Sequence, residues 1–255
     1  MLRELTQNFG IIYYRAAAEL KAEASNNFAG YIWWALQPFL ALAVYYTAFR
    51  WLIPYPDQRF VLFLFIGVTV WQLWSGTLLR AGNSMIVYRN MMLQMDIEKY
   101  IFPVSICLVN LVKFMVAFVL LLALSPLIGG TVSWQLAYLP PLLALLLLLT
   151  CGAAMALAAV VPFFPDLIMV IDFVLHLMMF LSGVFFDLKI LPQELQRFLY
   201  WNPLAVLIVQ FRRVIMDGAA PEWGPLCRVA LLALALTALG AWLLRHCSRK
   251  YPRMT

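Results

Sequence analysis

Charged residues are scarce in this sequence of 255 residues. Lys, Arg, Asp and Glu make up 12% of it, whereas Ala, Val, Ile, Leu, Met, Phe, Trp, Tyr and Cys make up 65%. Soluble domains contain about 25% charged residues and about 45–50% apolar residues. The few polar side chains present here cannot cover a water-soluble core of this size. The composition therefore excludes an ordinary soluble domain and indicates an integral membrane protein.

The sequence also lacks the residues from which common catalytic and metal sites are built. Its two histidines, His176 and His246, are too few for a histidine-based triad or zinc site, and its four cysteines show no C-x-x-C spacing. It has no G-x-x-x-x-G-K-[ST] motif, so the chain is not expected to bind ATP. We therefore expect no catalytic residue, no metal and no cofactor on this chain.

Long apolar runs dominate what is present, and residues 142–149 (LLALLLLL) show no polar alternation. Lipid admits only helices and closed barrels, and barrel strands alternate, so helices are favoured. A helix needs about 20 apolar residues to cross a bilayer. We predict an all-α integral membrane fold with six transmembrane helices. The predicted spans are residues 28–53, 60–79, 101–129, 134–164, 167–186 and 225–244.

Two segments outside these spans are amphipathic. Residues 1–27 place Leu2, Leu5, Phe9 and Tyr13 at helical spacing, which predicts an interfacial helix before a single membrane domain at 28–255. The alternative is a soluble helical tail. Residues 191–217 hold two stretches too short to cross a bilayer, which indicates a re-entrant helix pair.

Charge predicts the orientation of the chain in the membrane. Six spans place both termini on one side, and the basic tail of Arg245, Arg249, Lys250 and Arg253 favours the cytoplasm for that side. The net charge of +6 is attributed to an inner face held against anionic membrane lipid rather than to nucleic acid.

Three ionisable residues lie inside the predicted spans, where a charge is costly and often functional. They are Lys113 in the third span and Asp172 and His176, four residues apart, in the fifth. Three roles are considered for them. They form an interhelical Asp–Lys or Asp–His pair that fixes helix packing, they line a conduit, or they relay protons. Packing is favoured over conduit lining, and both over a relay.

Aromatic residues crowd the first two spans. Such side chains form membrane interface belts and pack cores, and their faces also stack on sugar rings. The aromatic residues considered for a conduit are Trp33, Tyr45, Trp71 and Trp74.

Residues 191–218 read LPQELQRFLYWNPLAVLIVQFRRVIMDG. This pattern of an LP…L helix, NPL, and a helix that ends in Arg and Gly resembles the ABC-2 type permeases that export O-antigen, capsule and teichoic acid. Residues 30–38 (GYIWWALQP) and 99–104 (KYIFPV) resemble the starts of that family's first and third spans. One departure is Ser182-Gly183-Val184-Phe185, where the family often has Ser-Pro-Val-Phe.

The resemblance implies a transporter in the bacterial inner membrane. It would contain two copies of this chain and two copies of an ABC ATPase, which would bind ATP and Mg²⁺, and it would export a lipid-linked polysaccharide. Segment 84–100 would couple to the ATPase, and segment 191–217 would form an outer gate. The residues implied are Arg89, Asp96, Glu98 and Lys99 for coupling and Pro192, Asn202, Pro203 and Arg212 for the gate.

Three alternatives are kept. An ABC-2 exporter of a lipo-oligosaccharide or a drug would share this layout. A secondary transporter would couple transport to protons through Asp172 and His176 and would need no ATPase. A membrane transferase would need a cluster of carboxylates, for which the sequence offers little beyond Asp96 and Glu98.

Overall fold

The computed structural model describes residues 2–26, 30–50, 59–94 and 98–247, and all regular elements in this part of the chain are helices. The long helices are α1 (Leu2–Asn26), α2 (Ile32–Arg50), α3 (Arg59–Gly82), α6 (Ile101–Leu124), α7 (Leu139–Val160) and α11 (Trp223–Cys247). The short α-helices are α4 (Ser84–Val87), α5 (Arg89–Gln94), α8 (Leu167–Leu181), α9 (Gln193–Leu199) and α10 (Pro203–Ile215). Four 3₁₀ turns complete the set: η1 (Ser125–Ile128), η2 (Trp134–Tyr138), η3 (Val161–Phe163) and η4 (Leu188–Ile190).

Five helical stretches of the described chain are long and apolar enough to cross a membrane. They begin at Ile32, Arg59, Ile101, Trp134 and Trp223, so they correspond to the predicted first, second, third, fourth and sixth spans. The all-helical membrane class is thereby confirmed.

The predicted fifth span, residues 167–186, is helical only as far as Leu181. The chain turns at Gly183, whose φ of +67° cannot belong to a right-handed helix. The 15 residues of α8 rise about 22 Å, less than the roughly 30 Å of a hydrocarbon core. The expectation of a helix that continues to residue 186 is therefore wrong.

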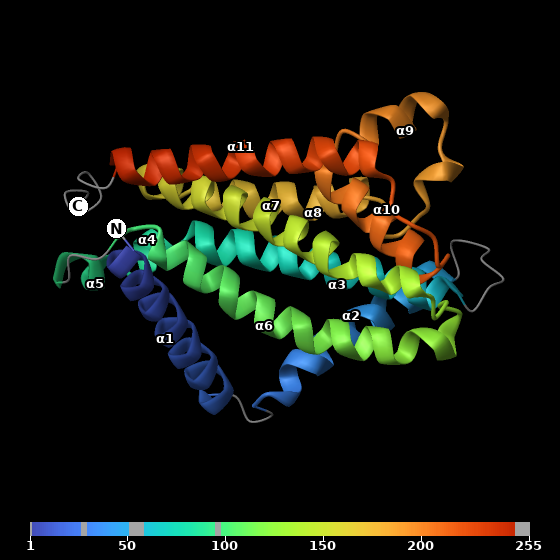
Figure 1. Cartoon of the computed structure of the whole chain (residues 1–255), viewed down its shortest axis with the longest axis horizontal. Helices are drawn as coiled ribbons and strands as arrows, with labels where there is room; N and C mark the ends of the chain where they lie inside the picture. The colour runs from blue at the N-terminus through green and yellow to red at the C-terminus, as the bar shows by residue number, and fades with distance from the viewer. Residues whose placement is uncertain (1, 27–29, 51–58, 95–97, 248–255) are drawn as a thin grey trace.

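Long helices run side by side along the bundle, and the chain returns to its starting end (Figure 1). The N-terminal end of α1, the short helices α4 and α5, and the C-terminal end of α11 lie together at one end. Helices α9 and α10 lie at the opposite end (Figure 1). The predicted coupling and gate segments are thus separated by the length of the bundle.

Helices α7 and α11 pack backbone to backbone through two glycines. A Cβ added at Gly152 would lie 2.6 Å from Oγ1 of Thr237, and one added at Gly240 would lie 2.8 Å from the backbone nitrogen of Ala156. Small residues at such crossings let helices approach closely in lipid, where dispersion rather than the hydrophobic effect drives association. This contact fixes the last span against the centre of the bundle.

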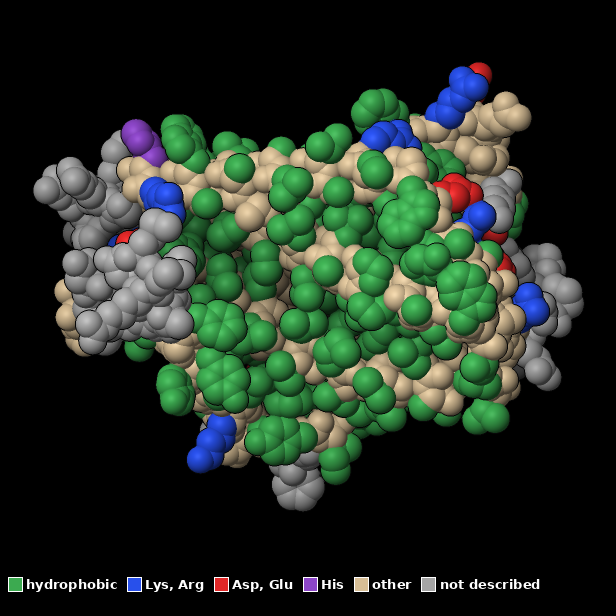
Figure 2. Space-filling model, in the orientation of Figure 1, with side chains coloured by type: hydrophobic (Ala, Val, Ile, Leu, Met, Phe, Trp, Pro, Cys, Tyr) green, Lys and Arg blue, Asp and Glu red, His purple; other side chains and the backbone are tan. Residues whose placement is uncertain are grey.

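The core lies between α3, α6, α7 and α10. Along α10, Leu204 through Ile208 are all buried. The outside is apolar as well: Figure 2 shows a central band of hydrophobic side chains on this face, with the charged side chains outside it. An apolar band between charged ends is the surface that a bilayer requires.

Candidate functional site

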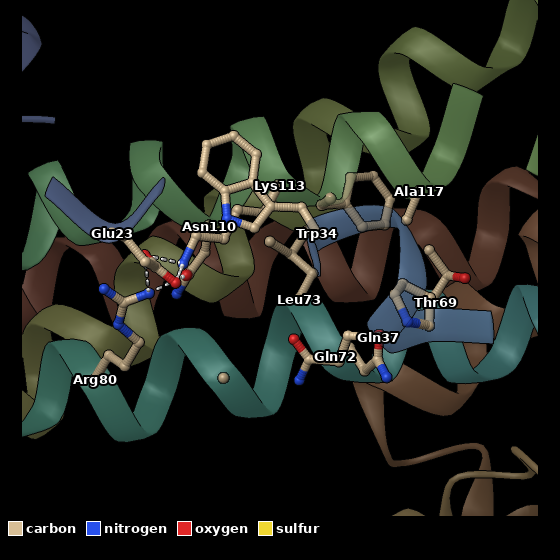
Figure 3. Close-up of a pocket in the computed structure, with 13 residues that line it drawn as sticks. Glu23, Trp34, Gln37, Thr69, Gln72, Leu73, Arg80, Asn110, Lys113 and Ala117 are labelled. Carbon is tan, nitrogen blue, oxygen red and sulfur yellow. Dashed lines mark hydrogen bonds and ion pairs between the residues drawn. The ribbon is translucent and has the colours of Figure 1, made fainter. Parts of the chain in front are cut away.

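Ion pairs fasten α1 to the bundle in a group that we call the α1 cluster. Its members are Glu19, Glu23, Arg80, Asn110 and Lys113, and Figure 3 shows four of them together. Both carboxylate oxygens of Glu23 accept hydrogen bonds from Lys113 in α6. Glu19 Oε1 lies 2.7 Å from Nη2 of Arg80 in α3, and Glu23 Oε2 lies 3.6 Å from Nη1 of the same arginine.

The cluster continues into the bundle through Asn110. Arg80 Nη1 donates to Asn110 Oδ1 over 3.1 Å, and Asn110 Nδ2 donates to Thr77 Oγ1 over 3.1 Å. Asn110 and Thr77 are both buried. The side chains of Arg80, Asn110 and Thr77 thus each have a hydrogen-bond partner, as burial requires. Lys113 pairs with Glu23, so the predicted alternative of an Asp172–Lys113 pair is wrong.

The face of α1 that carries Arg15, Glu19 and Glu23 turns toward the bundle. Ile12 and Ala16 are buried against it, whereas Phe9, Tyr13 and Tyr14 are exposed. The prediction of an N-terminal helix is confirmed, and the exposed aromatic side chains suit a membrane interface. Sequence reasoning missed the α1 cluster because Glu19 and Glu23 read as the solvated face of an amphipathic helix.

Arg15 joins α1 to the start of α6 and to the predicted coupling segment. Its guanidinium carbon lies 3.7 Å from the ring centroid of Tyr88 and 4.5 Å from that of Phe102. Its Nε donates to Ser105 Oγ over 3.0 Å, and its Nη1 contacts Met91 Sδ at 3.3 Å. A cation between aromatic faces is a favourable contact, so this one side chain links three segments.

The predicted coupling residues lie at the end of the bundle where α1 begins and α11 ends (Figure 1). Glu98 is exposed, Arg89 and Lys99 are half-buried, and Asp96 lies outside the described residues. A hollow of about 290 Å³ is lined by Glu98, Lys99, Tyr100, Leu244 and Arg245. Exposed apolar side chains accompany these charges on α4 and α5: Ile86, Val87, Met91 and Leu93.

Two groups of predicted residues meet at the opposite end, around a hollow of about 420 Å³ that we call the aromatic cavity. It lies between α3, α8 and the α9–α10 corner. Trp71 and Trp74 were predicted for the conduit, and Asn202 and Pro203 for the gate. Phe198 and Trp201, which the prediction did not include, add aromatic faces. Its lining residues are Trp71, Trp74, Val174, Leu175, Met178, Leu181, Ser182, Phe198, Leu199, Trp201, Asn202, Pro203 and Leu204.

Asn202 and Pro203 define the corner between α9 and α10. Asn202 Oδ1 accepts a hydrogen bond of 3.0 Å from the backbone nitrogen of Leu204, so it caps α10, and Pro203 takes the first helical position. Asn202 Nδ2 donates to Ser182 Oγ over 2.8 Å. The corner is thereby tied to the turn after α8. Pro192, in contrast, is exposed at the start of α9.

Arg212 is 7% exposed and lies in the interior rather than on the cavity wall. Its guanidinium donates to the carbonyls of Phe63, Gly183 and Val184 at 2.7–3.2 Å. A Cβ at Gly67 would lie 2.7 Å from Arg212 Nη2, so only glycine leaves room there. Arg212 therefore joins α10 to α3 and to the turn at Gly183, where the sequence departs from the resembled family.

The other predicted intramembrane residues lie on exposed faces. His176 Nδ1 lies 3.4 Å from Asp172 Oδ1, and the two side chains are 73% and 49% exposed. His176 Nδ1 lies nearer, at 2.8 Å, to the backbone carbonyl oxygen of Asp172. The two residues therefore make a contact within α8 and not the predicted interhelical pair. Trp33 is exposed, while Tyr45 is half-buried with its hydroxyl 3.7 Å from Met179 Sδ.

Comparisons with known proteins place these features in a family context. A family model described as ABC-2 type transporter matches residues 13–216. The chain is 27% identical over 239 residues to the O-antigen export system permease protein RfbA of Myxococcus xanthus, and the match covers 92% of each chain. It is 23% identical over 230 residues to the polysialic acid transport protein KpsM of Escherichia coli, and the match covers 89% of each chain.

Proposed function

Because the chain belongs to the ABC-2 type transporter family, we propose that it is the membrane permease of an exporter of lipid-linked polysaccharide. The observation that carries this proposal is its similarity, over about nine-tenths of its length, to proteins named for O-antigen export and polysialic acid transport. The aromatic cavity supports it, because indole faces offer sequence-tolerant, weak contacts to successive sugar rings. Loose contacts suit a polymer that has to keep moving.

The energy would come from a separate ATPase that carries ATP and Mg²⁺. The end of the bundle with α4 and α5 suits such a partner, because exposed apolar side chains lie there beside charges. Apolar contact with a charged rim is the usual composition of a protein interface. Arg89, Asp96, Glu98 and Lys99 would supply the charges, and Arg15 would hold the segment against α1.

Two copies of the chain would form the conduit. Asp172 and His176 lie on an exposed face of α8 among Phe173, Val174 and Leu177. A polar pair that faced lipid would be costly, whereas one that faced an aqueous passage shared by two copies would not. This supports the conduit interpretation of the pair over the packing interpretation. The α9–α10 corner would then form the outer gate.

The remaining topology is part of the same proposal. The chain would cross the inner membrane six times, with α8 as a short fifth crossing and α9 and α10 as the re-entrant pair. Both termini would be cytoplasmic. The basic residues near the C-terminus favour that side.

Deletion of the gene in its native host tests the function. The surface polysaccharide should disappear, and its lipid-linked precursor should accumulate at the inner membrane. In the deletion strain, a Trp201→Ala variant should export several-fold less polysaccharide than the wild-type gene at equal protein level. The reason is that the substitution removes an exposed aromatic side chain from the wall of the aromatic cavity. Trp134→Ala, which changes another exposed tryptophan outside the aromatic cavity, should restore export fully. Unaltered surface polysaccharide after deletion would refute the proposal.

A further inference from the structure

A second cavity, of about 280 Å³, lies between α1, α2, α3 and α6, and we call it the polar cavity (Figure 3). It shares no lining residue with the aromatic cavity. Its volume lies just below the usual range for small-molecule sites, so it suits a ligand of the size of one sugar ring. Its lining residues are Glu23, Trp34, Gln37, Pro38, Thr69, Gln72, Leu73, Gly76, Arg80, Asn110, Lys113, Phe114 and Ala117.

The charged end of the polar cavity is balanced. Glu19 and Glu23 face Arg80 and Lys113 in the α1 cluster, so the four charges cancel. An anion or a cation would have to displace an existing partner to bind there. A ligand without net charge would not.

The other end carries uncharged hydrogen-bonding groups. Gln37 from α2 and Gln72 from α3 both line this part of the cavity (Figure 3). Among the residues that the structure describes, neither carboxamide hydrogen-bonds another side chain or the backbone. Gln37 is exposed and Gln72 is half-buried, so both carboxamides are open to a ligand. Both belong to helices apolar enough to cross a membrane, where polar side chains often mark functional sites.

Trp34 adds an unused donor to this cavity. It is 8% exposed, and within the described ranges its indole N–H has no acceptor. A buried donor without a partner costs about 1–3 kcal/mol. The indole lies beside Lys113 and Asn110 (Figure 3), with Phe114 also on the wall. The wall of the cavity therefore contains a buried donor without an acceptor, next to aromatic surface, and a ligand would reach it only after a small shift of the indole.

We infer that the polar cavity binds one neutral sugar unit of the exported glycan. Sugar hydroxyls donate and accept hydrogen bonds, as the carboxamides of Gln37 and Gln72 do. The C–H faces of a sugar ring suit the aromatic and aliphatic part of the wall. The inference rests on the proposed function for the source of the sugar. The polar cavity borders α1, and the aromatic cavity borders α9. The two cavities would therefore hold successive parts of one glycan.

Saturation-transfer NMR on the full chain in phospholipid nanodiscs tests the binding. Nanodiscs are needed because detergents with sugar headgroups would compete. The probes are the methyl glycosides of glucose, galactose, mannose and rhamnose, with inorganic phosphate as the charged alternative. Wild-type protein should bind at least one glycoside with a millimolar dissociation constant and should not bind phosphate in competition with it.

Three variants identify the site. Gln37→Leu/Gln72→Leu should weaken binding at least fivefold, and Trp34→Phe, which keeps an aromatic ring but loses the N–H, should weaken it about two- to tenfold, the value of one hydrogen bond. Gln193→Leu, at an exposed position on α9, should bind like the wild type. Absent binding, equal binding by all variants, or displacement by phosphate would overturn the inference.

Export in cells decides the source of the sugar and separates this inference from the proposed function. The double glutamine variant should export less polysaccharide than the wild type at equal protein level. Normal export by a variant that has lost binding would overturn the assignment to the glycan and leave a glycolipid headgroup. A wild-type chain that exports polysaccharide but binds no glycoside would refute the cavity assignment and leave the permease function standing.

Discussion

Individual cations of this protein are stabilised inside the bundle in different ways. Lys113 pairs with a carboxylate from α1, whereas Arg212 donates to three backbone carbonyls of α3 and the turn after α8. The planar guanidinium, with its five donors, suits several acceptors at once, and the single ammonium suits one carboxylate. Both arrangements join segments that are far apart in the sequence, so each cation stabilises the contact between those segments.

The Lys113–Glu23 pair gives a prediction at this scale. Lys113→Met should lower the free energy of unfolding by about 2 kcal/mol, because it leaves the half-buried Glu23 with fewer partners. The double variant Lys113→Met/Glu23→Gln should recover part of that loss, because the unpaired charge is gone. Denaturant unfolding in nanodiscs measures both values. A double variant as unstable as the sum of the single variants would contradict a direct interaction.

Among whole elements, close approach of helices is decided by the smallest residues. The α7–α11 crossing depends on Gly152 and Gly240, where an added Cβ would meet backbone atoms of the other helix. Backbone cannot move aside as a flexible side chain can. This crossing therefore holds the last span in place without any charged contact.

Gly240→Ala should destabilise the protein by about 1–3 kcal/mol, the usual cost of overpacking. Gly224→Ala is the matched control, because a Cβ at Gly224 meets no atom within 4 Å and the residue lies in the same helix. Thermal unfolding of the two purified variants is compared with that of the wild type. If the Gly240→Ala and Gly224→Ala variants unfolded at the same temperature, α7 and α11 would be less closely packed than the structure shows.

Across the whole molecule, the segments proposed for coupling and for the gate lie at opposite ends. The α4–α5 segment and both ends of the described chain lie at one end, and the α9–α10 corner with the aromatic cavity lies at the other (Figure 1). A coupling surface and a gate on opposite sides of a membrane need this separation. The polar cavity, bordered by α1 and α2, lies apart from both.

Cysteine labelling in cells tests this arrangement. Cysteines introduced at the exposed Leu195 and Phe198 in α9 should react with a membrane-impermeant reagent added outside. A cysteine at the exposed Leu93 in α5 should react only after the membrane is opened. The exposed native Cys227 is first replaced by Ser, so that only the introduced cysteine is read. The buried Ile208 in α10 provides the control position, which should react in neither condition. Labelling of α9 from the cytoplasmic side alone would invert the proposed orientation.

The single sequence predicted much of the fold, because apolar run length and turn residues are local properties. Five spans were placed correctly, and the Asn202–Pro203 break between two short helices is present. The end of the fifth span was misplaced, since apolar residues resume at Val184 after Ser182 and Gly183, and hydropathy alone does not register the turn at Gly183. Trp71, Trp74 and Asn202 were predicted separately, and the fold brought them to one cavity.

The sequence by itself determined that the chain is a helical membrane protein, because its composition leaves too little polar surface for water. Tertiary structure alone decided which polar groups meet: Glu23 with Lys113, and Arg212 with the carbonyls at the turn. These partners lie on different helices and far apart along the chain. Helical periodicity gives the face of one helix, and only the packing of all of them determines what that face touches.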